Sequence, residues 1–293
     1  MRRLFRTVAE GRKSLASWSE LDELPKTFED FVGKLGDKYP GYSDMEYMDW
    51  LRRTRSLPSS TSGTHEIEYS SLNTSTWSKI FPLLRSLHYK YACEEHTRTL
   101  SDLESKKIFT KEKIPQFSTV NKYLLHKTGF KLVNVGGMIN PRTFLYGLGM
   151  GVFYSTQYIR HHSVPFYSPE PDIVHELMGH VPLLANPKFA EFSKGIGKLA
   201  FEASDEEIEI LAKVYFFTVE FGVANGKIVG AGILGSCKES EHVGTNKGKV
   251  LPWDWERVLG NELVLSDYQP SYADIGSIDN LGLILEELQQ RVL

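Results

Sequence analysis

Two histidines, His175 and His180, lie five positions apart in the segment PEPDIVHELMGHVP, residues 169–182. Three acidic side chains accompany them: Glu170, Asp172 and Glu176. Neutral imidazole is the commonest metal ligand that a protein supplies, and a short segment can direct two of them at one ion. The spacing therefore leads to the hypothesis of a metal site, which needs a third ligand from elsewhere in the chain.

The five-residue spacing restricts the geometry of such a site. A straight α-helix turns about 100° per residue, so His175 and His180 would project about 140° apart. The zinc-protease pattern H-E-x-x-H differs, because its histidines share one helix face. Gly179 weakens a helix and Pro182 cannot continue one, so we expect the helix to end at His180, whose side chain then turns back. Either histidine alone is more typical of a core residue; the pair with its acids favours a metal.

A carboxylate in an apolar segment is the candidate third ligand. Glu220 is the single acid in YFFTVEFGV, residues 215–223, and no Lys or Arg lies three or four positions away. Burying a carboxylate without a partner is costly, and a metal ion would supply the missing charge. The alternative is a solvent-facing glutamate at a helix C-terminus, which the helix dipole disfavours.

Two histidines and one carboxylate are typical of non-haem Fe(II) that activates O2. Zinc hydrolases also use this set of ligands, and in that case Glu176 would be the general base. The three residues alone therefore leave both metals open.

The composition is that of an ordinary folded globule. The chain has 293 residues, of which 41% are hydrophobic and 24% charged, enough for a sizeable core. A net charge of -3 gives no indication of a nucleic-acid partner, and no apolar run is long enough to span a membrane. Two cysteines, Cys93 and Cys237, form no disulfide framework, so we expect a cytoplasmic location. The Arg- and Ser-rich start favours a solvated tail, with an organelle transit peptide as the alternative.

The spacing of apolar residues predicts an α+β fold that is predominantly helical, with a small β component. Helices are expected over residues 77–96, 114–129, 143–160, 205–221 and 278–293, a strand over 228–234, and a polar loop over 56–64. Ser204 and Glu207 form a capping box that begins the helix carrying Glu220, and Gly222 ends it.

The ligand segments resemble the catalytic domain of the pterin-dependent aromatic amino acid hydroxylases, which comprise the phenylalanine, tyrosine and tryptophan hydroxylases. The resemblance is carried by TQYIRH at 156–161, PFYSPEPDIVHELMGHVPLLANPKFAEFS at 165–193 and YFFTVEFG at 215–222. Shorter matches such as KYPGYSDMEYMDWLRR and GAGILGS extend it over about residues 24–290. It implies this family's catalytic fold, and hydroxylation of an aromatic ring with Fe(II), tetrahydropterin (tetrahydrobiopterin or a related pterin) and O2.

The resemblance also implies roles for individual residues. The positions that match the iron ligands are His175, His180 and Glu220. Glu176 matches a catalytic acid near the pterin, and Glu170 a supporting acid. The positions that match pterin contacts are Val135, Gly137, Ile139 and Phe144, with Phe144 stacking on the bicyclic ring.

Arg160 matches the arginine that binds the carboxylate of the substrate. A guanidinium suits this role because its planar fork can donate two hydrogen bonds to a carboxylate. Without the resemblance, a surface cation is the alternative. The other positions that match substrate contacts are Ser168, Asp172, Phe216 and Gly235.

The chain departs from the family's animal members in its extent. Those members carry an N-terminal regulatory domain and a C-terminal tetramerisation segment, and we expect neither here. The expectation is a monomer in which residues 24–293 form a single catalytic domain after an N-terminal extension, residues 1–23.

Single positions bear on the substrate, a small aromatic amino acid. Phe216 stands where the phenylalanine and tyrosine enzymes have Trp and the tryptophan enzymes have Phe. Leu265 falls where tyrosine hydroxylases place an acid, and Gly235 replaces a usual serine. We expect phenylalanine to be converted to tyrosine, with tryptophan 5-hydroxylation or a broad specificity as the alternative.

Two functions of other classes compete with this interpretation. A zinc-dependent hydrolase with Glu176 as its base is disfavoured by the five-residue histidine spacing. A degenerate family member kept as a binding module is disfavoured because all three ligand positions are filled. The glycines of GLGMG, residues 147–151, do not have the G-x-G-x-x-G spacing of a nucleotide loop, and we expect them to allow close helix packing.

Overall fold

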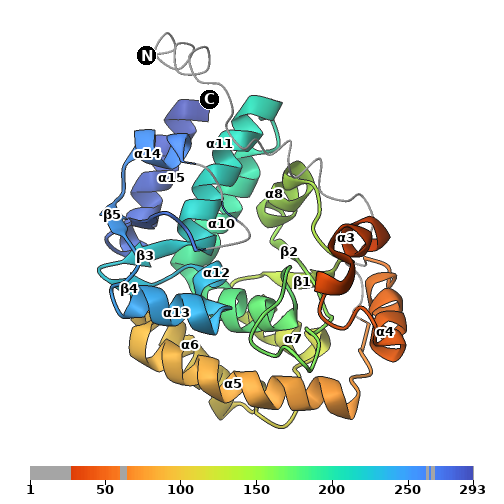
Figure 1. Ribbon diagram of the computed structural model, residues 1–293. Coiled ribbons are helices and arrows are strands. Elements are labelled where there is room, and N and C mark those ends of the chain that lie inside the picture. Colours follow the sequence, from red (N-terminus) through yellow and green to blue (C-terminus); the bar gives the residue numbers. More distant parts are fainter. Residues whose placement is uncertain (1–27, 60–64, 262–263, 265–267, 293) are drawn as a thin grey trace.

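The computed structural model describes residues 28–59, 65–261, 264 and 268–292 (Figure 1). The predicted extension 1–23, the end of the polar loop 56–64, and Leu265 lie outside these residues. The first half of the described chain holds α3 Phe28–Leu35, the 3₁₀-helix η1 Gly36–Lys38, α4 Met45–Arg55, α5 Ser71–Tyr91, α6 Glu94–Ser105, α7 Phe117–Lys127, β1 Lys131–Asn134, α8 Pro141–Gly149 and β2 Val152–Ser155.

The second half begins with the segment that carries both histidines. It holds the π-helix η2 His175–His180, α9 Val181–Leu184, α10 Pro187–Leu199, α11 Asp205–Tyr215, the π-helix η3 Phe216–Glu220, β3 Gly222–Ala224, β4 Lys227–Ile228, α12 Ala231–Leu234, α13 Cys237–Gly244, β5 Val250–Pro252, α14 Trp255–Gly260, β6 Tyr272–Asp274, the 3₁₀-helix η4 Ile278–Asn280 and α15 Leu281–Val292. Helix dominates, as expected. No helix among the described residues combines the length and apolar character that crossing a membrane requires.

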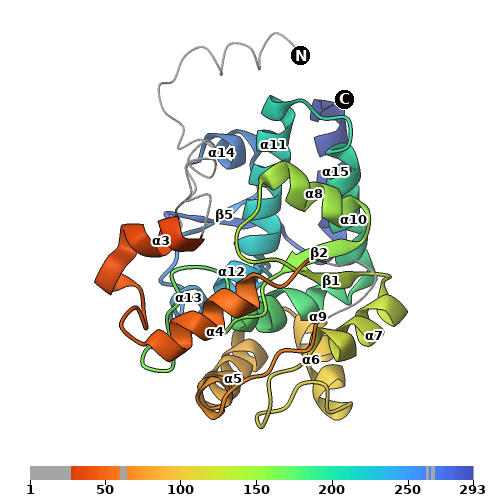
Figure 2. The ribbon, with the colours of Figure 1, turned by 90° about the vertical axis from the view of Figure 1, so that its right-hand side faces the viewer.

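Two small sheets connect the helices. Strands β1 and β2 pair in parallel, from Lys131 with Val152 to Asn134 with Ser155, and α8 forms the connection between them. The other sheet has the order β4-β3-β6-β5, in which β3 and β5 run parallel to β6. Figures 1 and 2 show α5 and α6 along one side of the molecule and the β1–β2 pair near its middle.

The core is built largely from helix faces. Helix α10 packs between α8 and α15, and α9 packs on α6. A Cβ atom placed on Gly149 of α8 would lie 2.7 Å from the backbone carbon of Gly197 in α10, so only glycine allows the two helices to approach this closely. The prediction that the glycines of residues 147–151 allow close helix packing is confirmed for Gly149, whereas Gly147 packs against β2 and Gly151 takes a positive φ.

The capping box predicted at Ser204 is also present. The Ser204 side chain accepts from the Glu207 N–H, and the Glu207 carboxylate accepts from the Ser204 N–H at 2.7 Å. The helix it begins stays helical to Glu220, as expected, although its last turn is a π-helix. The predicted helices 114–129 and 278–293 correspond to α7 and to η4 with α15.

Three predicted elements differ from the structure. The helix expected over 77–96 is interrupted, because Ala92 is extended and the Cys93 N–H bonds to the Ile228 carbonyl. The helix expected over 143–160 ends at Gly149; Gly151 then takes a positive φ, and the β-forming residues after it pair with β1 as β2. The strand expected over 228–234 is limited to Lys227–Ile228, and α12 follows.

Candidate metal centre

The two histidines lie on a π-helix and not at a helix end. In η2 the Val181 N–H donates to the carbonyl of Glu176, five residues earlier. This i to i+5 pattern places residues five apart on adjacent turns, so His175 and His180 share one face. The expectation that the helix ends at His180 is therefore wrong, since α9 continues directly and Pro182 lies in its first turn.

A buried histidine from another helix donates a hydrogen bond to the backbone of this segment. Pro182 has no N–H to offer to the carbonyl of Met178, four residues earlier. His96 of α6 supplies the donor, with its Nε2 at 3.0 Å from the Met178 oxygen. Its side chain has no exposed surface, so no water competes for the bond. The π-helix is thus stabilised by a contact from α6.

Glu220 is the last residue of the second π-helix, η3. The Phe221 N–H donates to the Phe216 carbonyl at 2.9 Å, again five residues earlier. Gly230 packs against this turn, because a Cβ atom there would lie 2.1 Å from the Glu220 carbonyl oxygen. No side chain fits at position 230, and this glycine therefore fixes how closely the chain leading into α12 approaches the Glu220 backbone.

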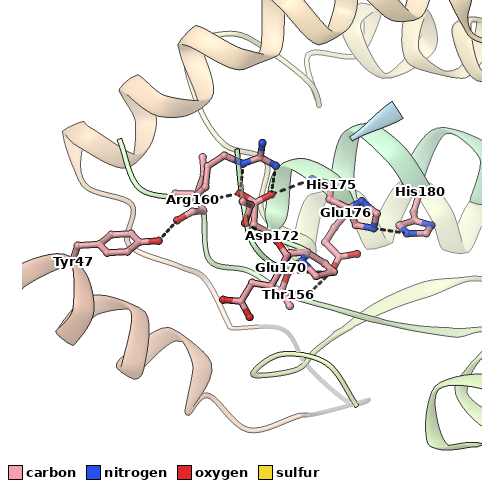
Figure 3. Close-up of polar contacts among 11 residues, drawn as sticks. Tyr47, Thr156, Arg160, Glu170, Asp172, His175, Glu176 and His180 are labelled. Atoms are coloured by element: carbon pink, nitrogen blue, oxygen red, sulfur yellow. Dashed lines mark hydrogen bonds and ion pairs between the residues drawn. The ribbon is translucent and has the colours of Figure 1, made fainter. Parts of the chain in front are cut away.

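These turns bring the three predicted ligands together. The Nε2 atoms of His175 and His180 are 2.9 Å apart, and the contact between the two imidazoles is drawn in Figure 3. The Glu220 carboxylate oxygens lie 3.2 Å from the His180 Nε2 and 3.7 Å from the His175 Nε2. The three side chains form a group whose donor atoms all lie within 4.8 Å of one another.

The donor atoms fit one divalent ion. Two atoms that each lie about 2.1 Å from an ion, at a right angle, are about 3 Å apart. The separations given above are close to this value. The Nε2 atom of His180 faces the other two donors. Its Nδ1 atom is buried and has no hydrogen-bond partner within the described chain. Two neutral imidazoles and one carboxylate also suit Fe(II) chemically.

Burial and charge act in opposite directions at Glu220. The side chain is 17% exposed, in keeping with the expectation of apolar surroundings. Burial by itself raises the pKa of Glu220, but the imidazole of His180, followed by that of His175, outweighs it, and the net shift is downward. The carboxylate is therefore ionised at neutral pH and available as a ligand.

Glu176 points into the protein beside the centre. Burial raises the pKa of its carboxyl group to about 7. Its Oε1 accepts two hydrogen bonds from Thr156, at 2.9 Å from the backbone N–H and 3.0 Å from the hydroxyl (Figure 3). Thr156 comes directly after β2, so the β1–β2 pair positions the carboxyl group.

Glu170 is held by residues that sequence reasoning did not single out. Its carboxylate forms an ion pair with Arg55 of α4 and accepts a hydrogen bond from the Tyr39 hydroxyl at 2.9 Å. Arg55 also donates to the Gly136 carbonyl at 2.7 Å and lies over the Tyr158 ring. This arginine thus joins Glu170 to the segment that holds the predicted pterin contacts.

The predicted pterin positions lie around this segment. Val135 is buried and its N–H bonds to the Ser155 carbonyl, while Gly137 and Ile139 are partly exposed. Phe144 on α8 makes edge contacts with Phe153 and Tyr215, at centroid distances of 5.6 and 5.2 Å.

One further ring contact links Phe144 to the centre. The Phe153 ring lies 4.6 Å from the imidazole of His180. Phe144 is therefore separated from the candidate ligands by a single aromatic ring.

Arg160 is buried and bound to Asp172. Its Nε and one Nη donate to the two carboxylate oxygens at 2.8 and 2.6 Å, as Figure 3 shows. Asp172 also accepts from the His175 N–H at 3.3 Å, which couples the arginine to the first ligand. Arg160 and Ser168 line a small pocket with Tyr47 and Tyr158. Because Arg160 is buried, the alternative that it is a surface cation is wrong.

The other two predicted substrate positions lie near the ligands. Phe216 begins the π-helix that ends at Glu220, and its ring lies 4.5 Å from that of Phe221. A Cβ atom on Gly235 would lie 2.9 Å from Nδ1 of His175, so Gly235 packs directly on the first ligand.

Three residues that support the centre were missed: Arg55, His96 and Thr156. A signal existed for Arg55, because it lies four positions after the buried Leu51 and seven after the buried Met48, on the inward side of α4. His96 and Thr156 act through contacts across 82 and 20 residues, and no local pattern indicates them.

The fold and this group of side chains define a helical protein with a candidate mononuclear centre of the two-histidine, one-carboxylate type. A sequence profile of the biopterin-dependent aromatic amino acid hydroxylases matches residues 16–291. The chain belongs to this family.

Its relatives include enzymes for all three aromatic amino acids. The chain is 39% identical to phenylalanine-4-hydroxylase of Bos taurus in an alignment of 262 residues, and the match covers 86% of this chain and 58% of the relative. It is 36% identical to tryptophan 5-hydroxylase of Xenopus laevis in an alignment of 282 residues that covers 91% of this chain and 58% of that protein. It is 38% identical to tyrosine 3-monooxygenase of Rattus norvegicus in an alignment of 288 residues that covers 93% of this chain and 57% of that protein. The chain thus spans less than two thirds of these relatives.

Solved structures confirm the predicted fold class. Phenylalanine hydroxylase of Chromobacterium violaceum with bound Fe(III) has a TM-score of 0.73 and 29% identity, and the match covers 83% of this chain and 92% of that chain. A structure of the same enzyme with iron(III) and 7,8-dihydrobiopterin has a TM-score of 0.71 at 29% identity, covering 83% and 91%.

Proposed function

We propose that this chain is a monooxygenase that hydroxylates the ring of an aromatic amino acid, with phenylalanine as the preferred substrate and tyrosine as its product. The observation that carries the proposal is the convergence of His175, His180 and Glu220, whose donor atoms lie within 4.8 Å of one another. Membership of the biopterin-dependent family supports iron and a tetrahydropterin as the cofactors, with O2 as co-substrate.

Bound iron and pterin would together supply the activation of O2, which no amino-acid side chain provides. The chain's residues hold the groups and control protons. Oε1 of Glu176 is occupied by Thr156, so Oε2 is the atom that carries or releases a proton near neutral pH. Phe144 offers a ring face for a pterin, and Glu170 with Arg55 fixes the adjacent segment.

Arg160 is proposed to bind the carboxylate of the amino acid. Asp172 holds the guanidinium in a fixed orientation through two hydrogen bonds, which lowers the entropy cost of binding a carboxylate in the pocket beside Tyr158 and Ser168. Because Asp172 also contacts the His175 N–H, the position of the substrate is coupled to that of the first ligand.

Tryptophan is the second candidate substrate. It is favoured by Phe216, which is the residue type of the tryptophan enzymes at this position and is buried in the π-helix that ends at Glu220. A zinc-dependent hydrolase is the alternative from another class, and it predicts zinc in the purified protein and no pterin-dependent O2 uptake. The expectations of a monomer, a cytoplasmic location and a domain boundary at residue 24 stay predictions.

The proposal is tested with purified protein, Fe(II) and tetrahydrobiopterin. O2 uptake and amino-acid hydroxylation are measured with phenylalanine, tryptophan and tyrosine in turn. We expect the highest turnover with phenylalanine, and a loss of at least 100-fold in Glu220→Gln, since even residues that only support ligands typically cost about 10–100-fold.

Glu209→Gln is the matched control, because Glu209 is an exposed acid on α11 in the same helical run. It should leave both iron content and turnover unchanged. Full turnover in Glu220→Gln would refute the assigned ligands, and hydroxylation of none of the three amino acids by the iron-loaded chain would refute the function.

A further inference from the structure

A second group of metal-binding side chains lies away from the candidate iron centre. It consists of Asp44, His161 and His162, whose donor atoms all lie within 4.8 Å of one another. Asp44 precedes α4, and the histidines follow Arg160 at the start of a hydrogen-bonded turn. Two segments more than 100 residues apart therefore meet at these three side chains.

His161 is held in a fixed orientation. Its side chain is 7% exposed and makes an edge contact with the Tyr47 ring, at 4.7 Å between centroids. A Cβ atom on Gly41 would lie 2.6 Å from Cδ2 of His161, so the imidazole packs directly on the Gly41 backbone. Its Nδ1 lies 2.7 Å from the Ser163 hydroxyl, and its Nε2 therefore points to Asp44.

Asp44 is equally well positioned. Its Oδ1 accepts from the Tyr47 N–H at 3.0 Å as the N-cap of α4, which leaves Oδ2 facing Nε2 of His161 at 3.2 Å. One carboxylate and one imidazole are thus oriented before any ion binds.

His162 supplies the third donor. Its ring lies 4.1 Å from that of His161, and it is partly exposed, so it can adjust to an ion. A hydrogen bond between Asp44 and His161 accounts for those two residues alone. It does not account for a second imidazole whose donor atom lies within 4.8 Å of both.

We propose that Asp44, His161 and His162 form a second divalent-cation site. Two imidazoles and one carboxylate favour a first-row transition ion such as Zn²⁺ or Co²⁺ over Mg²⁺ or Ca²⁺, which prefer oxygen ligands. A groove of about 510 Å³ lies beside the site, and its lining includes Ser43 and Ser163, the sequence neighbours of Asp44 and His162. The ion would join the start of α4 to the chain directly after Arg160.

The site is tested by calorimetric titration of the metal-free chain with Zn²⁺ at pH 7.5. We expect two equivalents per chain, of which one is lost in His162→Ala. In Asp44→Asn, the second equivalent should bind at least tenfold more weakly. Asparagine remains a good N-cap, so this variant keeps the cap while removing the charge.

His126→Ala is the control, because His126 is an exposed histidine on α7 outside both groups, and it should still bind two equivalents. Glu220→Gln should keep the equivalent that His162→Ala loses, which separates this proposal from the proposed function. A single equivalent in the unaltered chain that His162→Ala leaves unchanged would overturn the second site. So would a second equivalent that persists in both His162→Ala and Asp44→Asn.

Discussion

A buried histidine pair on α5 and α6 makes the stability of the protein depend on pH. The side chains of His88 and His96 have no exposed surface, and their rings are 4.7 Å apart. The Nε2 of His88 donates to the Leu234 carbonyl at 2.8 Å, as that of His96 does to Met178. The Nδ1 of each ring has no partner within the described chain, so both rings are neutral and a proton would be a buried, unpaired charge.

The size of the effect follows from the pKa of His88. Burial lowers this pKa from 6.5 to about 4, against a smaller opposite effect of the hydrogen bond to Leu234. Above pH 6.5 neither the folded nor the unfolded chain binds the proton, and stability is unaffected. As the pH falls from 6.5 to 4 only the unfolded chain gains it, so the free energy of unfolding decreases. A difference of about 2.5 pKa units corresponds to about 3 kcal/mol in full, and to about 2 kcal/mol between pH 7 and pH 5.

The assay is urea unfolding at pH 7, 6 and 5, comparing the original chain with His88→Gln. Glutamine retains an N–H donor for the Leu234 carbonyl but does not titrate. Its unfolding free energy should therefore fall by about 2 kcal/mol less over this range. His96, whose pKa burial and then His88 also lower, acts in the same direction and remains in both proteins. His126→Gln on the surface is the control. An equal pH dependence in His88→Gln and the original chain would refute the reasoning.

Two further substitutions test the packing of the helices. Gly197→Ala should lower the free energy of unfolding by about 3 kcal/mol or more, because the new Cβ would lie 2.0 Å from the Gly149 nitrogen. The control is Gly282→Ala on the open face of α15, which should be neutral or slightly stabilising. Thermal unfolding measures both effects. Ser204→Ala removes the hydrogen bond to the Glu207 N–H and should cost about 1 kcal/mol in urea unfolding, whereas Ser204→Asp should not. A Gly197→Ala protein as stable as Gly282→Ala, or an unchanged Ser204→Ala, would contradict these assignments.

The sequence was sufficient to choose the side chains that converge at the centre. His175 and His180 are distinguished by residue type and spacing, and Glu220 by its isolation among apolar neighbours. These are properties of single residues and short segments, and the resemblance to a family added the roles of Arg160 and Phe144. The helices and turns that bring these side chains together were predicted less well, because they depend on contacts between distant segments.

The errors in secondary structure have a common physical origin. Residues 143–160 contain apolar residues at helical spacing, but Gly151 permits a turn with positive φ and β1 offers a partner for the chain after it. The run 228–234 is β-prone, yet Gly230 lies against the Glu220 carbonyl and the chain turns into α12. In both cases a tertiary contact decides between two local structures of similar free energy.

The two π-helices explain why a five-residue spacing can serve one ion. An α-helix would separate His175 and His180 by about 140°, and the i to i+5 pattern removes this separation. A π-helix is rare because its hydrogen bonds are less favourable, so other contacts must stabilise it. His96 bonds to the carbonyl that Pro182 leaves free in the first, and Gly230 packs against the backbone at Glu220 in the second. The distances among the ligands are therefore set by residues that would never touch the metal, and a chain that kept all three ligands but had a side chain at position 230 could not form this centre.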